Sequence, residues 1–131
     1  MTTYLLDTTV LVDYFRGRQR ARLLLERLAD DGHTLAICDI NIAELFAGLP
    51  EAQRPVAREL LDSLQYLEIP PPVAELAGLL RFDRARRGIT IHLPDAMIAA
   101  VAIANDATLI TANVRDFPLP DLSLLELPSA P

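Results

Sequence analysis

The chain has 131 residues, of which 51% are apolar, 23% charged and 5% aromatic, which excludes a disordered chain and fits one globular domain. Its 12 basic and 18 acidic side chains give a formal net charge of −6, which excludes a uniformly basic nucleic-acid coat protein. The single cysteine, Cys38, excludes an internal disulfide and a cysteine-based zinc site, and is typical of a reducing compartment.

The predicted elements alternate between short apolar strands and helices. In chain order, we expect a strand at 4–6, helices at 10–16 and 20–30, a strand at 35–37, a helix capped by Asp39 or Asn41 and ending at 49, a helix at 55–64, a strand at 66–69, helices at 73–87 and 94–104, and strands at 109–111 and 122–127. This alternation is typical of an α/β domain with a parallel sheet covered on both faces. We expect one domain over 1–127 and a frayed tail at 128–131.

The apolar segments are too short to cross a membrane. The longest, residues 96–105, is half the length of about 20 residues that a spanning helix needs. The apolar residues near the N-terminus follow no basic leader and end at Asp7, so no signal peptide is expected. We therefore expect a cytoplasmic protein without a membrane partner.

Four acidic residues stand beside apolar segments. Asp7 directly follows the first strand, and Asp116 follows the fourth after a short loop. Asp95 opens the apolar helix at 96–104, and Glu44 interrupts an apolar helix. Taken singly, each acid has an ordinary alternative role: Asp7 or Asp95 as a helix cap, the glutamate as a solvated helix position and the last aspartate as a turn residue.

Taken together, the four acids indicate a cation site. The ligand crevice of a parallel sheet lies at the carboxyl ends of its strands, where two of these acids are expected. Carboxylates gathered there would repel one another unless a cation lay between them. Oxygen donors without histidine or cysteine favour Mg²⁺ or Mn²⁺, and such sites commonly perform chemistry at phosphorus.

Four sequence segments contain these acids. They are Leu-Leu-Asp-Thr-Thr-Val-Leu at 5–11, Asn-Ile-Ala-Glu-Leu at 41–45, Leu-Pro-Asp-Ala-Met-Ile-Ala-Ala at 93–100 and Leu-Ile-Thr-Ala-Asn-Val-Arg-Asp-Phe at 109–117. In this order they resemble the signatures of PIN domains, and closely those of the VapC-type toxins of bacterial toxin–antitoxin pairs. The resemblance implies a three-layer α/β/α fold with a short, mainly parallel sheet of four to five strands, and a magnesium-dependent ribonuclease for which Mn²⁺ can substitute.

The resemblance also implies roles for individual residues. Asp7 and Asp95 would be the principal metal ligands, Glu44 would complete the acidic cluster, and Asp116 would hold a water of the metal or a second, weaker ion. Thr9 and Asn113 would orient the carboxylates, with Thr111 as a lesser contributor. Asn113 and Asp116 lie in the same loop, so either of the two could face the metal.

Two concentrations of arginine, at 16–27 and 81–87, are candidates for binding phosphate, with solvated helix faces as the alternative. We expect the second to contact RNA through Arg84, Arg86 and Arg87, because it leads towards Asp95 in the chain. The resemblance implies an antitoxin partner that inserts a helix or an extended arm near the site, and a homodimer. Apolar side chains of the nearby helices could line the antitoxin groove or pack in the core: Leu11, Val12, Phe15, Leu45, Phe46 and Leu49.

The sequence thus predicts a metal-dependent endoribonuclease that hydrolyses RNA phosphodiester bonds and acts as a toxin inhibited by a cognate antitoxin. One alternative is a non-catalytic PIN-like protein-binding module, although a pure scaffold has no physical need for the full set of acids. Another is a metal-dependent nuclease or phosphatase that acts on DNA or another phosphate ester. The chemistry at phosphorus is common to both nucleases, so the sequence does not separate RNA from DNA.

Overall fold

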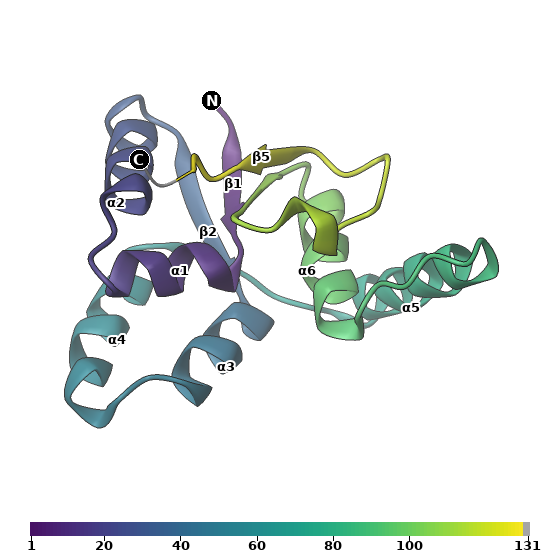
Figure 1. Ribbon diagram of the computed structural model, residues 1–131, viewed down its shortest axis with the longest axis horizontal. Coiled ribbons are helices and arrows are strands. Elements are labelled where there is room, and N and C mark those ends of the chain that lie inside the picture. The colour runs from purple at the N-terminus through teal and green to yellow at the C-terminus, as the bar shows by residue number, and fades with distance from the viewer. Residues whose placement is uncertain (130–131) are drawn as a thin grey trace.

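The computed structural model describes residues 1–129, which form a five-stranded sheet with helices on both faces (Figure 1). The strands are β1 (Thr3–Leu6), β2 (Thr34–Cys38), β3 (Gln65–Leu67), β4 (Thr108–Thr111) and β5 (Leu124–Glu126). Their order is β3-β2-β1-β4-β5, and every neighbouring pair is parallel. The predicted three-layer α/β/α fold and the strand count are therefore confirmed.

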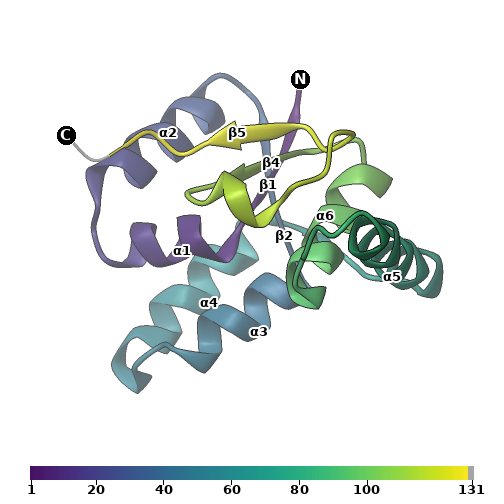
Figure 2. The same cartoon turned by 45° about the vertical axis from the view of Figure 1, so that its right-hand side comes forward.

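The helices divide between the two faces of the sheet (Figures 1 and 2). They are α1 (Thr8–Phe15), α2 (Gln19–Asp30), α3 (Asp39–Ala47), α4 (Arg54–Asp62), α5 (Pro71–Arg86) and α6 (Leu93–Ala104), with short 3₁₀ turns η1 (Glu51–Gln53) and η2 (Val114–Asp116). Successive strand residues point to opposite faces, so Leu5 packs in the core under α5 and α6, whereas Leu6 packs in the core under α1, α2 and α4. No helix among the described residues is long and apolar enough to cross a membrane.

Several helix starts differ from the sequence prediction. Helix α1 begins at Thr8, two residues early, since Asp7 caps it. Helix α6 begins at Leu93, so Asp95 lies inside the first turn instead of capping it. Neither predicted cap of α3 holds that position: Cys38 does, and the Asn41 side chain accepts a hydrogen bond from the Cys38 N–H at 2.9 Å.

The chain order of the strands places a crevice beside β1. From β1 the chain builds outward through β2 to β3, and then returns to add β4 and β5 on the other side. The boundary between β1 and β4 is therefore the point where the winding reverses, which is where open α/β sheets bind ligands. The Asp7 N–H donates to the Ile110 carbonyl at 2.9 Å, so the end of β1 is fixed directly beside the end of β4.

The chain after β5 returns along the surface beside α2. Arg20 donates a hydrogen bond to the Pro128 carbonyl at 3.2 Å, which ties this segment to the start of α2. The frayed tail predicted for 128–131 lies partly outside the described residues, at 130 and 131. The domain predicted over 1–127 contains all the helices and strands of the described chain.

Candidate functional site

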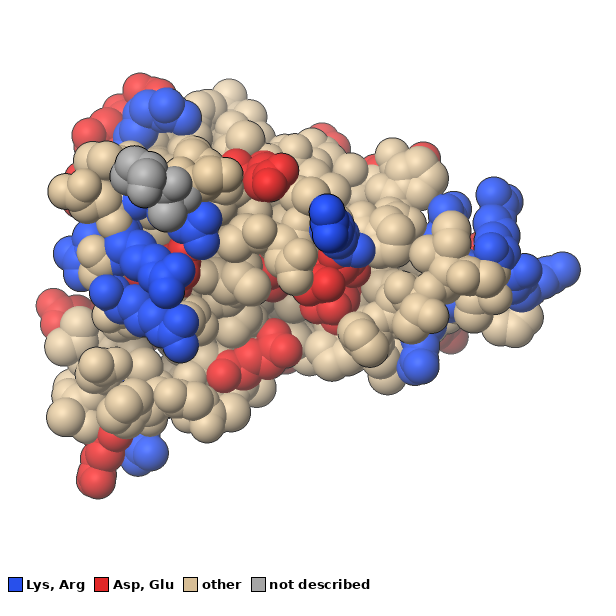
Figure 3. All heavy atoms as spheres, in the orientation of Figure 1, with Lys and Arg blue, Asp and Glu red and all other residues tan. Residues whose placement is uncertain are grey.

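The four predicted acids line one pocket at the carboxyl ends of β1 and β4. They come from four segments: Asp7 from the end of β1, Glu44 from α3, Asp95 from the first turn of α6 and Asp116 from η2. Figure 3 shows acidic atoms gathered near the middle of one face of the molecule. The fold therefore brings together carboxylates that are as much as 109 positions apart in the sequence (116 − 7).

Asp7 is buried and its carboxylate is held by three hydrogen bonds. Its Oδ1 accepts from the Thr8 N–H at 2.8 Å, and its Oδ2 accepts from the Thr9 hydroxyl at 2.9 Å and the Thr111 hydroxyl at 2.8 Å. Each hydroxyl also accepts a backbone N–H from residues 112–113, which leaves its proton for Asp7. Thr9 and Thr111 thus both hold the Asp7 carboxylate by hydrogen bonds of similar length.

Glu44 is oriented by two residues that were not predicted from the sequence. The Thr8 hydroxyl donates to Glu44 Oε1 at 2.7 Å, and the Asn41 amide lies 3.5 Å from the same hydroxyl. Asn41 is fully buried, and its oxygen is already bound to the Cys38 N–H. The available signal was spacing, because Asn41 precedes Glu44 by three residues and so lies beside it on one helix face.

The loop after β4 separates the roles of its two polar candidates. Asp116 lines the pocket, whereas Asn113 is exposed and does not. The Asn113 amide donates to Asp116 Oδ2 at 2.8 Å, so Asn113 orients the acid beside it. Of the two, Asp116 is the residue that faces the pocket.

Burial and mutual repulsion disfavour the charged forms of two acids in the pocket. Burial raises the pKa of Asp7, the bonds from Thr111, Thr9 and the Thr8 N–H partly offset this, and the charge of Glu44 adds to it. Burial, followed by the charges of Asp116, Asp7 and Glu44, raises the pKa of Asp95 to about 6. Within the described chain, neither acid has an ion pair with an arginine. The charges of these two acids are therefore not compensated by an ion pair.

A fifth carboxylate in the pocket, Asp13, was not predicted and is already neutralised. Its Oδ2 accepts from Arg20 Nε at 2.7 Å and lies 2.6 Å from Arg20 Nη2, while its Oδ1 lies 3.5 Å from Arg18. Arg22 stacks over the Tyr14 ring, 5.0 Å from its centroid. Most of the first arginine concentration is thus committed to contacts within the protein.

The second arginine concentration lies away from the acids. Arg84 and Arg86 are in the last turn of α5 and Arg87 caps it, and none of the three lines the acidic pocket. Figure 3 shows basic atoms at the end of the molecule where Figure 1 places α5. Sequence proximity to Asp95 does not translate into proximity in the fold, because the loop at 87–92 returns from the tip of α5.

The structure has two apolar concavities besides the acidic pocket. One adjoins it directly, since Val12, Arg16 and Glu44 line both, and it also contains Phe15 and Leu49. Of the six apolar residues predicted for an antitoxin groove, three are buried in the core (Leu11, Leu45 and Leu49) and three are half-buried (Val12, Phe15 and Phe46).

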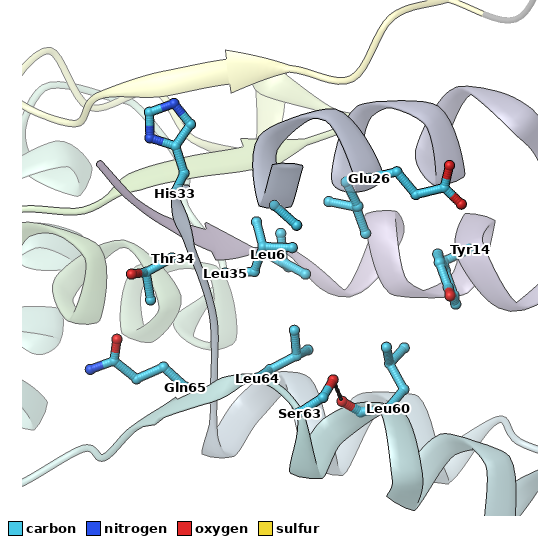
Figure 4. Close-up of a pocket in the computed structure, with 12 residues that line it drawn as sticks. Leu6, Tyr14, Glu26, His33, Thr34, Leu35, Leu60, Ser63, Leu64 and Gln65 are labelled. Atoms are coloured by element: carbon cyan, nitrogen blue, oxygen red, sulfur yellow. Dashed lines mark hydrogen bonds between the residues drawn. The ribbon is translucent and has the colours of Figure 1, made fainter. Parts of the chain in front are cut away.

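The other concavity is separate from the acids. It lies between α2, β2 and α4, with Leu6, Leu35 and Leu64 at its centre and His33 and Tyr14 towards its ends (Figure 4). None of the four acids lines it. The concavity that contains Phe15 and Leu49 is therefore continuous with the acidic pocket, whereas the concavity around Leu6, Leu35 and Leu64 is not.

The raised pKa of Asp95 predicts how stability depends on pH without metal. Its ordinary pKa is 3.8 and its folded pKa is about 6, so the folded state binds the proton more tightly than the unfolded state. This contribution is complete below pH ~4 and is lost as pH rises through about 6. After allowance for solvent screening, we expect the protonation of Asp95 to contribute about 1 kcal/mol to the free energy of unfolding.

Thermal melting of wild type and Asp95→Asn in chelator, from pH 4 to 8, measures this contribution. As pH rises, the melting temperature of the variant should exceed that of wild type by a growing difference. A gap that stays constant over this range would contradict the assignment to Asp95.

Comparison with known proteins agrees with this architecture. The structure is a parallel sheet between two layers of helices, with a pocket at its switch point that four acids line. Residues 4–120 match the model of the PIN domain family. The chain belongs to the PIN domain family.

Its relatives include proteins that share most of its length. The chain is similar to Ribonuclease VapC19 from Mycobacterium tuberculosis, with 36% identity over 121 residues that cover 90% of this chain and 95% of the relative. The crystal structure of VapBC2 from Rickettsia felis bound to a DNA fragment from their promoter matches with a TM-score of 0.83 and 29% identity, covering 95% of this chain and 98% of that one.

A toxin–antitoxin complex from Klebsiella pneumoniae matches with a TM-score of 0.78 and 31% identity, covering 93% and 95% of the two chains. The predicted family resemblance is therefore confirmed.

Proposed function

We propose that the chain is a metal-dependent endoribonuclease that hydrolyses RNA phosphodiester bonds and acts as the toxin of a toxin–antitoxin pair. The observation that carries this proposal is the meeting of Asp7, Glu44, Asp95 and Asp116 in one pocket at the switch point of the sheet. The relatives named ribonucleases and the toxin–antitoxin complexes of similar fold support it.

The residues of the pocket fit Mg²⁺, with Mn²⁺ as a substitute. The donors are carboxylate oxygens, which these hard cations prefer, and the repulsion that raises the pKa of Asp95 is relieved by a positive charge. Among residues 1–129, no three His, Cys, Asp or Glu side chains converge closely enough to hold an ion together. Magnesium takes one or two protein carboxylates directly and keeps several waters.

The chain's own contribution is to hold the carboxylates in place. We assign Asp7 and Asp95 as principal ligands, and Glu44 and Asp116 as secondary ligands or ligands through water. The hydrogen bonds to three of these acids fix their orientation before substrate binds, which reduces reorganisation during the reaction. A bound Mg²⁺ would supply an acidified water as nucleophile and neutralise charge on the phosphate and leaving oxygen.

We propose that a cognate antitoxin inhibits the protein from the concavity adjoining the pocket. Val12 and Phe15 offer apolar contacts there, and Glu44 borders both hollows. A partner segment that lay in this concavity would reach the carboxylates directly, and a basic side chain on it would compete with the metal. In this placement the partner would inhibit by occluding the site.

Three further assignments complete the proposal. Arg84, Arg86 and Arg87 would hold RNA beyond the pocket as a distal contact, through their positive charge at the end of α5. The chain would form a homodimer, for which Leu79 and Phe82, 60% and 58% exposed on α5, are candidate contacts. The protein would act in the cytoplasm, where its RNA substrate is found.

Cleavage by the purified protein tests the proposed function. We expect cleavage of single-stranded or structured RNA with Mg²⁺ or Mn²⁺, no cleavage in chelator, and recovery when the metal is restored, because no ion pair within the described chain neutralises the four acids. The readout is product formation from end-labelled RNA beside DNA of the same sequence. Equal cleavage in chelator would contradict the metal site, cleavage of DNA alone would identify a DNA nuclease, and no cleavage with either metal would identify a binding module.

A further inference from the structure

We propose that Arg16 binds a backbone phosphate of the RNA near the phosphate that is cleaved. This inference rests on the proposed function and adds a substrate-binding residue to the same pocket. Arg16 caps the C-terminal end of α1, whereas Asp7 caps the N-terminal end of the same helix.

The acidic pocket follows one face of α1 from end to end. Its lining residues on this helix are Thr8, Thr9, Val12, Asp13 and Arg16, which recur at the spacing of a single helix face. Eight helical residues at 1.5 Å each span about 12 Å. Arg16 therefore stands at the opposite end of the pocket from Asp7, where its long side chain can meet a phosphate further along the same strand.

Arg16 is available to a ligand, unlike its neighbours in sequence. Arg18 and Arg20 are paired with Asp13, and Arg22 stacks on an aromatic ring. The Arg16 side chain is exposed, and in the described part of the chain it makes no ion pair or hydrogen bond. Its guanidinium keeps its full capacity for bidentate contact with a phosphate.

Arg16 is also the only basic side chain, among the described residues, that lines the pocket. An RNA backbone that approaches four carboxylates is repelled unless positive charge lies beside them. A cation between the acids would act at the cleaved phosphate, which leaves the next phosphate without a counter-charge. Because Arg16 also lines the adjoining concavity, a strand that leaves the pocket in that direction passes its guanidinium.

The test compares Arg16→Gln and Arg16→Lys with the matched control Arg27→Gln, an exposed arginine of α2 that lines none of these hollows. For cleavage of a short single-stranded RNA, we expect Arg16→Gln to raise KM about tenfold and to change kcat less than about twofold, since a charged hydrogen bond to the ground state is lost. The salt dependence of binding should fall by about one phosphate contact. Arg16→Lys should keep most of the affinity, and the control should match wild type.

A parallel measurement keeps binding separate from cleavage. The affinity for the same RNA is measured for Asp95→Asn and for the double variant Asp95→Asn/Arg16→Gln. The difference between the two affinities gives the contribution of Arg16 to binding without product formation. An unchanged KM and salt slope would overturn the proposal. A fall in kcat alone would also overturn it. Failure of the proposed function would instead appear as absent cleavage by the wild-type protein.

Discussion

Asp7→Asn and Asp95→Asn should each lower RNA cleavage by at least about a hundredfold, yet the two variants should differ in stability when metal is withheld. Both remove a principal carboxylate of the proposed metal site, so both weaken the electrostatic stabilisation on which the reaction depends. The structure places the two side chains in different surroundings, and this difference separates their effects on folding.

Asp95→Asn should raise the melting temperature in chelator at pH 7. The Asp95 carboxylate lies in the first turn of α6 and accepts no side-chain or capping hydrogen bond among the described residues, while burial and three like charges oppose its ionisation. Removing its charge relieves that repulsion at little cost in hydrogen bonding. A gain of about 1 kcal/mol corresponds to roughly 3 °C for a domain of this size.

Asp7→Asn should be less stable than Asp95→Asn by at least about 1 kcal/mol under the same conditions. Both oxygens of Asp7 accept hydrogen bonds, from the Thr8 N–H on one side and from the hydroxyls of Thr9 and Thr111 on the other. The NH₂ group of an asparagine at this position would face hydrogen-bond donors instead of acceptors. The stability gained by removing the negative charge is therefore offset by a buried clash between donors.

Melting curves and cleavage rates of the two variants, beside wild type, give both readouts. Asp121→Asn is the matched control, because Asp121 is an exposed loop acid that lines none of these hollows. If both variants melt below wild type in chelator and still cleave RNA, the aspartates are structural caps and the metal site is wrong.

Much of the fold was predictable because the strands have a simple local signature. Leu5 and Leu6 point to opposite faces and both are fully buried, so a short run of apolar residues identifies a strand covered on both sides. Helix starts were less predictable. The choice between Cys38 and Asp39 as the cap of α3 depends on where the Asn41 side chain turns, which follows from tertiary packing.

The acids of the site were predictable because each stands where an apolar segment ends. The residues that orient them were harder to find, because a threonine beside an aspartate is common in loops and helix starts. Thr8 was missed since its partner Glu44 is 36 positions away in the chain. Asp13 was missed because its partner Arg20 is seven positions away, beyond the end of α1, and only the fold brings the two together.

Asp13→Ala should lower the free energy of unfolding by about 2 to 3 kcal/mol. Asp13 is 5% exposed and pairs with Arg20, whose side chain is 19% exposed and also bonds the Pro128 carbonyl. Deleting the carboxylate leaves the guanidinium half-buried without its counter-charge, which costs more than the pair itself contributes. Urea unfolding at constant pH measures the loss.

The double variant Asp13→Ala/Arg20→Leu distinguishes this explanation from a simple loss of packing. Removing both charges eliminates the unpaired guanidinium, so the double variant should recover much of the stability that Asp13→Ala loses. The hydrogen bond from Arg20 to the Pro128 carbonyl is also lost in the double variant, so the recovery is not complete. The loss in Asp13→Ala should also persist in high salt, because a buried pair is weakly screened. Additive losses in the double variant would show that the two side chains stabilise the fold independently. The explanation by an unpaired guanidinium would then be wrong.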